Sequence, residues 1–525
     1  MRSRAVVVAA VLGVALVSGG WLMQAGYDGA GSHVTSERLF DEVMKRVENF
    51  YVDTITEPQL YRKAVDGLLL ELHDPHTVYL PPDRLAKLNE STTGRYAGVG
   101  IQMDVRDGWI TVVAPLPGTP AQRAGILTGD RVVEIDGKPT HSWTSDEAVK
   151  ALRGAPGSVV NVVIERPGNT TRLPFSLTRE EIRFHSVQHA LMLKDSIGYV
   201  ALSIFSENSD QELRAAIDSL RGRGMRALVF DLRSDPGGLL DQGVGVADLF
   251  LDPGQKIVSM RGRTKDSDRD YVDRRPQPWP QLPLVVLVDS NSASASEIVA
   301  GALQDHDRAL IVGTTSYGKG SAQSLFPVTD SSALKLTTAL WYTPSGRSIN
   351  KAHPNADDDD QDALRSLGAE SARPHFKTDA GRTVLGGGGI TPDVIVADSD
   401  ADAKAANLQA ALGKHVVEFR DVLTDYALEL KGQKRITSTN FTVTPAMRSE
   451  LYDHLRRRGV SIPRTLFDAD SSVVDRLVAD QIARYVFGPD AEYERLLHRD
   501  PDVSTALGLL ARARTQDELL RAAKR

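Results

Sequence analysis

Serines are concentrated in the segment 290–296 (SNSASAS), directly before an apolar run that predicts a helix. A serine before a helix is usually an N-cap, but capping explains one serine and not the whole segment. A serine hydroxyl can also attack a carbonyl carbon when a nearby base removes its proton. The small residues of SASAS would let a substrate backbone approach closely. We therefore treat Ser290, Ser292, Ser294 and Ser296 as candidate nucleophiles.

Two side chains are near enough in sequence to serve as the base. His306 lies about three helical turns further along the same predicted helix, roughly 15 Å away, which makes it a poor partner. Lys319 stands between Gly318 and Gly320 after the next predicted strand, whose end returns to the same sheet edge in a parallel layout. A lysine is a base only when burial or a positive neighbour keeps it neutral. Lys319 is thus the candidate base for the serines, although from these residues alone a surface lysine in a glycine turn is the default interpretation.

Competing chemistries fit the sequence less well. Residues 313–319 (GTTSYGK) match the GxxxxGK pattern of a phosphate-binding loop, but Gly320 replaces the required hydroxyl and strand-like sequence follows. No G-x-S-x-G turn surrounds the serines, which disfavours a Ser/His/Asp hydrolase. The absence of cysteine excludes thiol nucleophiles, thiolate metal sites and disulfides. Neither His73 with His76 nor the acidic run 356–360 is expected to bind a metal.

Strands and helices alternate from residue 197 onward. IGYVALSIF, ALVFDL, LPLVVLVD and ALIVG predict buried strands, with helices predicted between them. This order predicts an α/β fold with a mostly parallel sheet. Sites in such sheets form at strand-to-helix turns, where a helix N-terminus offers free N–H groups. The serines lie at one of these turns, and the glycine turn DPGG at 235–238 lies at another.

Residues 93–178 have a different pattern, in which short β-rich runs alternate with turns and two short helices. The segment 118–140 (GTPAQRAGILTGDRVVEIDGKPT) resembles the central signature of PDZ domains. Gly98 and Gly100 precede a strand, so successive N–H groups could hold a carboxylate. The resemblance implies that Gly98, Val99, Gly100 and Ile101 bind a protein C-terminus, which adds as a strand. A plain glycine turn is the alternative.

The N-terminus carries a location signal. MRSR is followed by about twenty apolar residues, roughly the length that crosses a bilayer. No A-x-A cleavage pattern follows, so we expect an uncleaved anchor with the remaining chain on the outer side, in the periplasm or cell envelope. A removed signal and a buried core helix are the alternatives. The net charge of -7 argues against nucleic acid as a partner.

The chain of 525 residues is long enough for several domains. Helical periodicity marks the residues before the β domain and those after the α/β core, and an acidic, glycine-rich stretch near the end of the core predicts a flexible insertion. The predicted division is an anchor at 1–27, a helical domain at 32–92, a PDZ domain at 93–178, an α/β core at 179–400 with a flexible insertion at 352–389, and a helical domain at 401–525.

Several segments together resemble the carboxyl-terminal processing peptidases, also called tail-specific proteases. They are residues 290–323, ALVFDLRSDPGGLL, YTPSGRSI and GITPDV, and the resemblance covers roughly residues 40–398. It implies a ClpP/crotonase-like core and a serine endopeptidase with a Ser/Lys dyad and no cofactor. The resemblance assigns Ser294 as nucleophile, Lys319 as general base and Gln323 as support for the lysine. It also places N–H groups of Ala295 and Gly238 in the oxyanion hole and gives Asp305 a supporting role.

The expected substrates are proteins or peptides with free apolar C-terminal tails. An adaptor or activator is a candidate partner, and the amphipathic helices of 401–525 fit a homo-oligomer. The alternative function is a peptide-binding scaffold that holds tails without cutting them. The joint presence of Ser294, Lys319 and Gln323 favours the peptidase.

Overall fold

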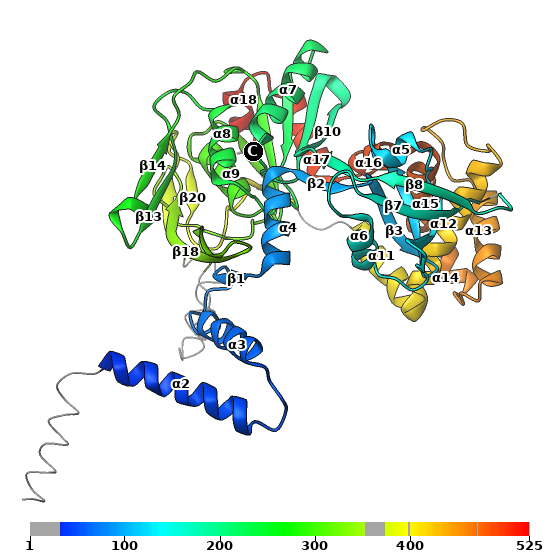
Figure 1. Cartoon of the computed structure of the whole chain (residues 1–525). Helices are drawn as coiled ribbons and strands as arrows, with labels where there is room; N and C mark the ends of the chain where they lie inside the picture. Colours follow the sequence, from blue (N-terminus) through cyan, green and yellow to red (C-terminus); the bar gives the residue numbers. More distant parts are fainter. Residues whose placement is uncertain (1–31, 168, 352–372, 397–399, 470, 524–525) are drawn as a thin grey trace, which may run out of the picture. The chain divides into compact units, whose positions relative to one another are not determined.

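The computed structural model describes residues 32–167, 169–351, 373–396, 400–469 and 471–523 (Figure 1). The predicted anchor at 1–27 lies outside these residues. Among the described helices, none is long and apolar enough to cross a membrane. The chain divides into two compact units, one of residues up to 80 with 325–336, and one of residues 81–324 with 337–525.

The first unit is a pair of helices followed by a short strand. The helices are α2 (Ser32–Phe50) and α3 (Glu57–Leu70), and the strand is β1 (Val78–Leu80). Thr56 begins α3, where its N–H donates to the side chain of Gln59 over 3.1 Å, and Pro58 fits the first turn because its missing N–H is not needed there. Strand β1 pairs antiparallel with residues 333–335 of β18 (Ser332–Tyr342).

A small antiparallel β domain follows α4 (Pro82–Thr93) in the second unit. Its strand order is β3-β4-β5-β7-β8, with β6 beside β5. Alternate side chains of β7 are buried, as expected for a sheet with one face on a core. The prediction of a small β domain with two helices is confirmed. Its elements are β3 (Ile101–Arg106), β4 (Trp109–Pro115), α5 (Pro120–Arg123), β5 (Arg131–Ile135), β6 (Lys138–Pro139), α6 (Ser145–Leu152), β7 (Val159–Glu165) and β8 (Leu173–Thr178), flanked by the pair β2 (Arg95–Gly98) and β9 (Glu180–Arg183).

The central sheet of the second unit has the order β10-β11-β12-β15-β16-β21. Only β10 runs antiparallel to its neighbour in this sheet, so the predicted mostly parallel α/β core is confirmed. Every residue of β12 and β15 is buried, which explains why these strands are apolar apart from Asp231 at the end of β12. The strands are β10 (Val187–Met192), β11 (Ile197–Leu202), β12 (Ala227–Asp231), β15 (Leu284–Val288), β16 (Leu310–Gly313) and β21 (Val394–Ile395).

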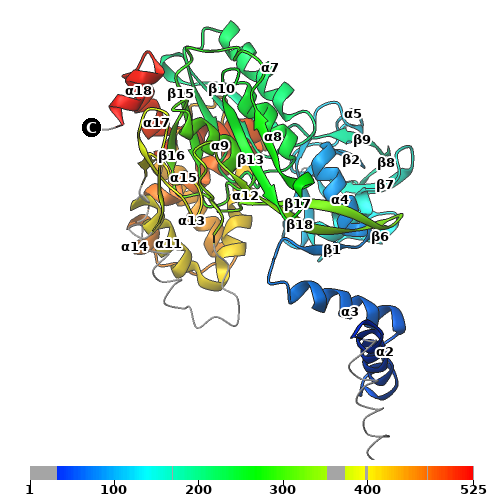
Figure 2. The same cartoon turned by 90° about the vertical axis from the view of Figure 1, so that its left-hand side faces the viewer.

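Helices cover both faces of this sheet. Side chains such as Leu228 and Phe230 pack on one face with α7 (Ser209–Gly222), α8 (Leu240–Asp248) and α9 (Ala295–Asp305). Their neighbours Ala227 and Val229 face the other side, where α17 (Pro501–Ala511) and α18 (Gln516–Ala522) pack. Figure 2 shows these two C-terminal helices, in red, beside β15 and β16. The end of the chain is therefore part of the α/β core.

Further strands and helices complete the unit. Strands β13 (Lys256–Gly262) and β14 (Arg269–Val272) pair with each other, and β13 also pairs with β18, which β17 (Ser321–Thr329) flanks. Residues 373–389, which the sequence placed in a flexible insertion, instead include the hairpin of β19 (His375–Lys377) and β20 (Thr383–Leu385). Arg373 donates to the carbonyls of Gly386 and Gly389 and so ties down this glycine-rich stretch.

The remaining C-terminal helices have a hydrophobic core of their own. Phe419, Tyr426, Leu451 and Phe467 are among the buried side chains that form it. The helices are α11 (Asp400–Leu412), α12 (Val416–Gly432), α13 (Pro445–Arg457), α14 (Arg464–Ala469) and α15 (Ser471–Ile482), followed by a π-helical turn (Ala483–Phe487). The next helix, α16 (Pro489–Leu497), instead packs Leu497 into the cluster on the central sheet.

Candidate active site

Ser294 occupies the turn between β15 and α9. Its backbone has φ 56° and ψ −112°, a left-handed conformation that is strained for a residue with a side chain. Within 292–296 it is the residue that is not buried. The hydroxyls of its neighbours are engaged, because Ser292 donates to the carbonyl of Leu232 over 2.8 Å and Ser296 to that of Asp235 over 3.0 Å. Among Ser292, Ser294 and Ser296, Ser294 is therefore the serine that a substrate can reach, while the fourth candidate, Ser290, is exposed at the start of the turn.

Two turns meet around Ser294, the 232–238 turn after β12 and the 289–294 turn after β15. The N–H of Ser234 donates to Asp289 Oδ1 over 2.9 Å, and the N–H of Ser292 donates to the same oxygen over 3.0 Å. The N–H of Ala293 donates to the carbonyl of Asp235 over 3.0 Å. These bonds hold the two turns in one arrangement.

The glycines of the 232–238 turn lie against Ser294. Gly237 has φ 89°, and a Cβ added there would come within 2.7 Å of Ala295 N and 2.9 Å of Ser294 Cβ. Only glycine fits such an approach. The N–H of Gly237 already donates to Asp235 Oδ1 over 2.8 Å. The N–H groups of Gly238 and Ala295 are consequently the candidates for an oxyanion hole, and they are the two groups that the resemblance assigns to it; their role stays a prediction.

Glu297 is the residue that the sequence analysis missed. Its carboxylate is fully buried at the first turn of α9. Oε2 accepts the N–H groups of Ser294 and Lys319, each over 2.9 Å, and Oε1 accepts Ser316 Oγ over 2.6 Å and the N–H of Gly318 over 2.7 Å. One carboxylate thus joins the serine turn to the lysine turn. The S-x-x-E spacing of a capping box was the signal that could have revealed it.

Burial dominates the electrostatics of Glu297. It raises the pKa of this carboxyl, while the hydrogen bonds from Ser316, Lys319, Gly318 and Ser294 act in the opposite direction. These four donors stabilise the ionised form and so oppose part of the effect of burial.

Lys319 lies in the turn after β16 and is partly buried. The same turn is tied to the serine turn a second time, because the N–H of Tyr317 donates to the carbonyl of Ser292 over 3.0 Å. Gln323 lies four residues further along the chain, in β17. Its Nε2 donates to Ser321 Oγ over 2.9 Å and Thr337 Oγ1 over 3.2 Å. Support of Lys319 by Gln323 stays a prediction.

Two other sequence candidates lie at the far end of α9. Asp305 forms an ion pair of 2.8 Å with the fully buried Arg347 and accepts the N–H of Ser345. The helix rise places it roughly 15 Å from Ser294, so it can support the fold but cannot reach the reacting atoms. His306 is similarly engaged, with Nδ1 2.7 Å from Asp379 and Nε2 2.7 Å from the carbonyl of Lys256.

The predicted tail-binding residues lead into β3, an edge strand of the β domain. Gly98 ends β2, and Val99 is buried in the domain core. Gly100 has φ 76°, and a Cβ there would come within 2.3 Å of Thr119. Ile101 begins β3, which pairs with β4 on one side, so that among the described strands its other edge is open to an added strand.

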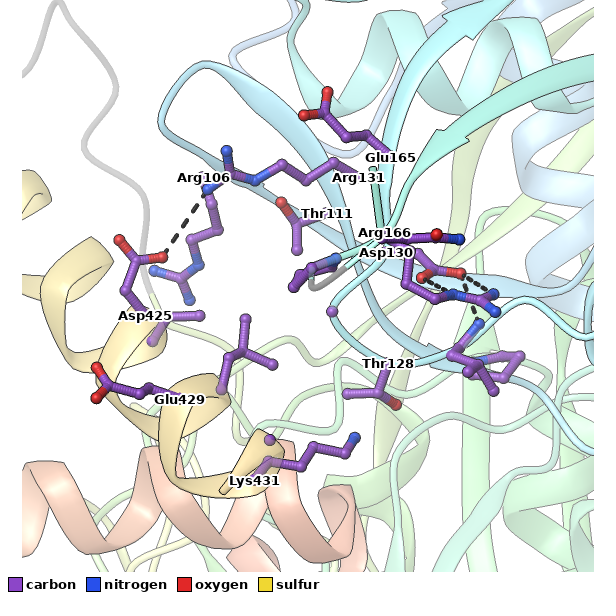
Figure 3. Close-up of a pocket in the computed structure, with 18 residues that line it drawn as sticks. Arg106, Thr111, Thr128, Asp130, Arg131, Glu165, Arg166, Asp425, Glu429 and Lys431 are labelled. Atoms are coloured by element: carbon purple, nitrogen blue, oxygen red, sulfur yellow. Dashed lines mark hydrogen bonds and ion pairs between the residues drawn. The ribbon is translucent and has the colours of Figure 1, made fainter. Parts of the chain in front are cut away.

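A hollow of 920 Å³ lies elsewhere, between the β domain and α12 (Figure 3). Arg131 and Thr128 line it on one side, and Asp425 and Lys431 on the other. Arg131 is 3.9 Å from Asp425, which bridges the two walls. Neither Ser294 nor Lys319 lines this hollow, so it is separate from the candidate catalytic residues.

Comparisons with known proteins give consistent similarities. The profile of peptidase family S41 matches residues 196–357, and a PDZ-domain profile matches residues 111–166. A carboxy-terminal-processing protease of Bartonella bacilliformis is 40% identical over 314 residues, which are 59% of this chain and 71% of that protein. Carboxy-terminal processing protease CtpA of Bacillus subtilis is 32% identical over 326 residues, 62% of this chain and 69% of that protein. The solved photosystem II D1 C-terminal processing protease is 30% identical, with a TM-score of 0.35, over 65% of this chain and 99% of that one.

Proposed function

Because this chain belongs to peptidase family S41, as a carboxy-terminal processing serine protease with a PDZ domain, we propose that Ser294 and Lys319 are its catalytic dyad. The observation that carries this assignment is the shared carboxylate oxygen of Glu297, which both backbone N–H groups reach over 2.9 Å. The two nitrogens can be no farther apart than twice that distance. A serine and a lysine 25 positions apart in sequence are thereby held at one place.

The reaction proceeds in two halves. Ser294 Oγ attacks the carbonyl carbon of the scissile peptide bond, and Lys319 Nζ takes the hydroxyl proton. The carbonyl oxygen becomes negative and is stabilised by the N–H groups of Ala295 and Gly238. Lys319 then returns the proton to the leaving amine, and the C–N bond breaks. Water attacks the resulting ester in the same way, with Lys319 again as base, and the acid product leaves.

Lys319 must be neutral to begin this cycle. Its partial burial in a glycine turn favours that state. The carboxylate oxygens of Glu297 accept hydrogen bonds from the hydroxyl of Ser316 and from backbone N–H groups. The dipoles of these fixed donors stabilise its ionised form.

The substrate is recognised by its C-terminal tail. The tail extends along the open edge of β3, and its carboxylate lies at the N–H groups of residues 99–101. Val99, Ala148 and Leu152 are buried near this edge, while Ile101 and Met103 are partly exposed and can contact tail side chains. Apolar tails fit this surface.

The site of action is the outer side of a membrane, with residues 1–27 as anchor. The basis is the sequence pattern of arginines followed by about twenty apolar residues. Fractionation of cells, with protease added to intact spheroplasts, tests it. Degradation of the chain from outside is expected, and full protection would contradict this location.

Cleavage of a reporter with an apolar C-terminal tail tests the activity. The full chain should cut it, while Ser294→Ala and Lys319→Ala should not, and an amidated tail should raise KM. Activity in either variant would contradict the dyad. Tail binding without cleavage by the parent would favour the scaffold alternative.

A further inference from the structure

Arg233 lies in the 232–238 turn, between the end of β12 and the glycines beside Ser294. Its side chain is mostly buried. Nε donates to both oxygens of Asp231 over 3.0 Å, and Nη2 donates to Asp231 Oδ2 over 2.7 Å. This first partner belongs to the same strand end and does not by itself hold the turn in place.

The other two partners come from the C-terminal part of the chain. Nη2 of Arg233 lies 2.8 Å from Asp500 Oδ2, and Nη1 donates to Asp502 Oδ2 over 2.9 Å. Asp500 is also the N-cap of α17, where its Oδ1 accepts the N–H groups of Asp502 and Val503. The N-cap and the first turn of helix α17 therefore contact the guanidinium group of Arg233.

Helix α17 is a firm support for this contact. Val503, Ala506 and Leu510 are buried against Val229 and Val285 of the central sheet. A second tie exists at the same strand end, because Tyr199 donates to Asp231 Oδ2 over 2.7 Å and its hydroxyl lies 2.6 Å from that of Tyr493. The C-terminal helices thus hold the end of β12 at two points.

The 232–238 turn connects Arg233 to the candidate catalytic centre. Ser234 follows Arg233 directly, has φ 57°, and donates its N–H to Asp289 of the serine turn. Gly237 and Gly238, four and five residues beyond Arg233, lie against Ser294 and Phe205. A turn with several left-handed residues keeps its shape only if its surroundings hold it.

We propose that Asp500 and Asp502 are positioning residues for catalysis, which clamp Arg233 and so aim the Gly238 N–H at the developing oxyanion. The inference rests on the oxyanion role proposed above for Gly238. It assigns the C-terminal helices a part in turnover in addition to their part in folding. Because the tail is bound at β3, loosening the clamp should affect the chemical step and not tail binding.

The test is the double variant Asp500→Asn with Asp502→Asn, in the full chain. Asparagine is also a good N-cap, so α17 keeps its start while two of the three carboxylates at Arg233 lose their charge. We expect kcat to fall at least about tenfold and KM for a tailed peptide to stay within about twofold. The affinity for a peptide boronic acid, which mimics the tetrahedral intermediate on Ser294, should fall by a similar factor as kcat.

Asp475→Asn is the matched control, because Asp475 accepts two bonds of 2.7 Å from Arg448 in the helical region, away from the sheet. An unchanged kcat in the double variant, or equal losses in the control, would overturn the inference. If the double variant does not fold, Asp502→Asn alone, which leaves the cap of α17 intact, gives the same reading. Absence of cleavage and of boronate binding in the parent would instead refute the proposed function.

Discussion

The backbone N–H groups of Ser294 and Lys319 donate to one and the same carboxylate oxygen, Oε2 of Glu297, each over 2.9 Å. The buried carboxylate of Glu297 thus fixes the relative position of the two turns that carry these residues. A nucleophile and a base that are fixed in this way need little rearrangement when substrate binds.

Replacement of Glu297 by glutamine should therefore impair turnover and stability together. Glutamine keeps the size, but its NH2 group would face N–H donors, and at least one buried donor would lose its acceptor. Such a loss costs about 1 to 3 kcal/mol. Thermal unfolding and kcat measure the two effects. Full activity in Glu297→Gln would show that the shared carboxylate does not position the dyad.

Replacement of Gly237 by alanine should lower kcat about a hundredfold or more, because the new Cβ would lie 2.7 Å from Ala295 N and push apart the groups proposed to bind the oxyanion. Gly254→Ala is the matched control. Gly254 has φ 93°, close to the 89° of Gly237, but nothing lies within 4 Å of its added Cβ. If both variants lose the same activity, the loss is caused by backbone strain at a positive φ and not by displacement of the groups proposed to bind the oxyanion.

Asp235 should make the stability of the protein fall as the pH rises. Burial raises the pKa of this carboxyl well above its ordinary value, against the hydrogen bond from the N–H of Gly237. Its Oδ2 has no hydrogen-bond partner among the described residues, which suits the neutral form. The unfolded chain releases the proton above about pH 4, so the folded state loses this advantage between that pH and the raised pKa.

Asparagine mimics the neutral acid and should remove this loss. We expect Asp235→Asn and the parent to have similar free energies of unfolding near pH 4, with the variant increasingly more stable above it. Denaturant titrations at a series of pH values measure the difference. A difference that does not grow with pH would mean that Asp235 is ionised in the fold.

Gly100→Ala should abolish tail binding, because its Cβ would lie 2.3 Å from Thr119 and distort the start of β3. KM for tailed substrates should then rise toward that of amidated ones. Gly137→Ala in the same domain is the control, since it has the same φ of 76° and open space around the added Cβ. Fluorescence anisotropy of a labelled tail peptide measures both, and unchanged binding to Gly100→Ala would place the tail elsewhere.

Local patterns in the sequence were sufficient to predict the parallel sheet, the PDZ domain and the peptidase family. The apolar residues of a strand such as β12 are consecutive in the sequence, and so are the turn residues around Ser294. Periodicity and spacing therefore reveal both. The role of Glu297 was hidden, because a glutamate in the first turn of a helix usually faces water. Only the fold brings the N–H of Lys319 to it.

Pairs that are distant in sequence were beyond such reasoning. Arg233 and Asp502 are 269 residues apart, and no spacing connects them. The helices of 401–525 have similar sequence patterns, because a helix that packs on the central sheet and a helix that packs in a separate core both require an amphipathic face. The structure separates them: α17 and α18 cover the central sheet, while α11 to α15 surround their own core.

Ser294 should form the acyl-enzyme with help from Lys319. Intact-protein and peptide mass spectrometry tests this after the full chain has reacted with an activated peptide ester and the reaction has been quenched with acid. We expect an added acyl mass on the peptide that contains Ser294, absent in Ser294→Ala and formed much more slowly in Lys319→Ala. Acylation at another residue, or undiminished labelling of Ser294→Ala, would contradict the proposed dyad.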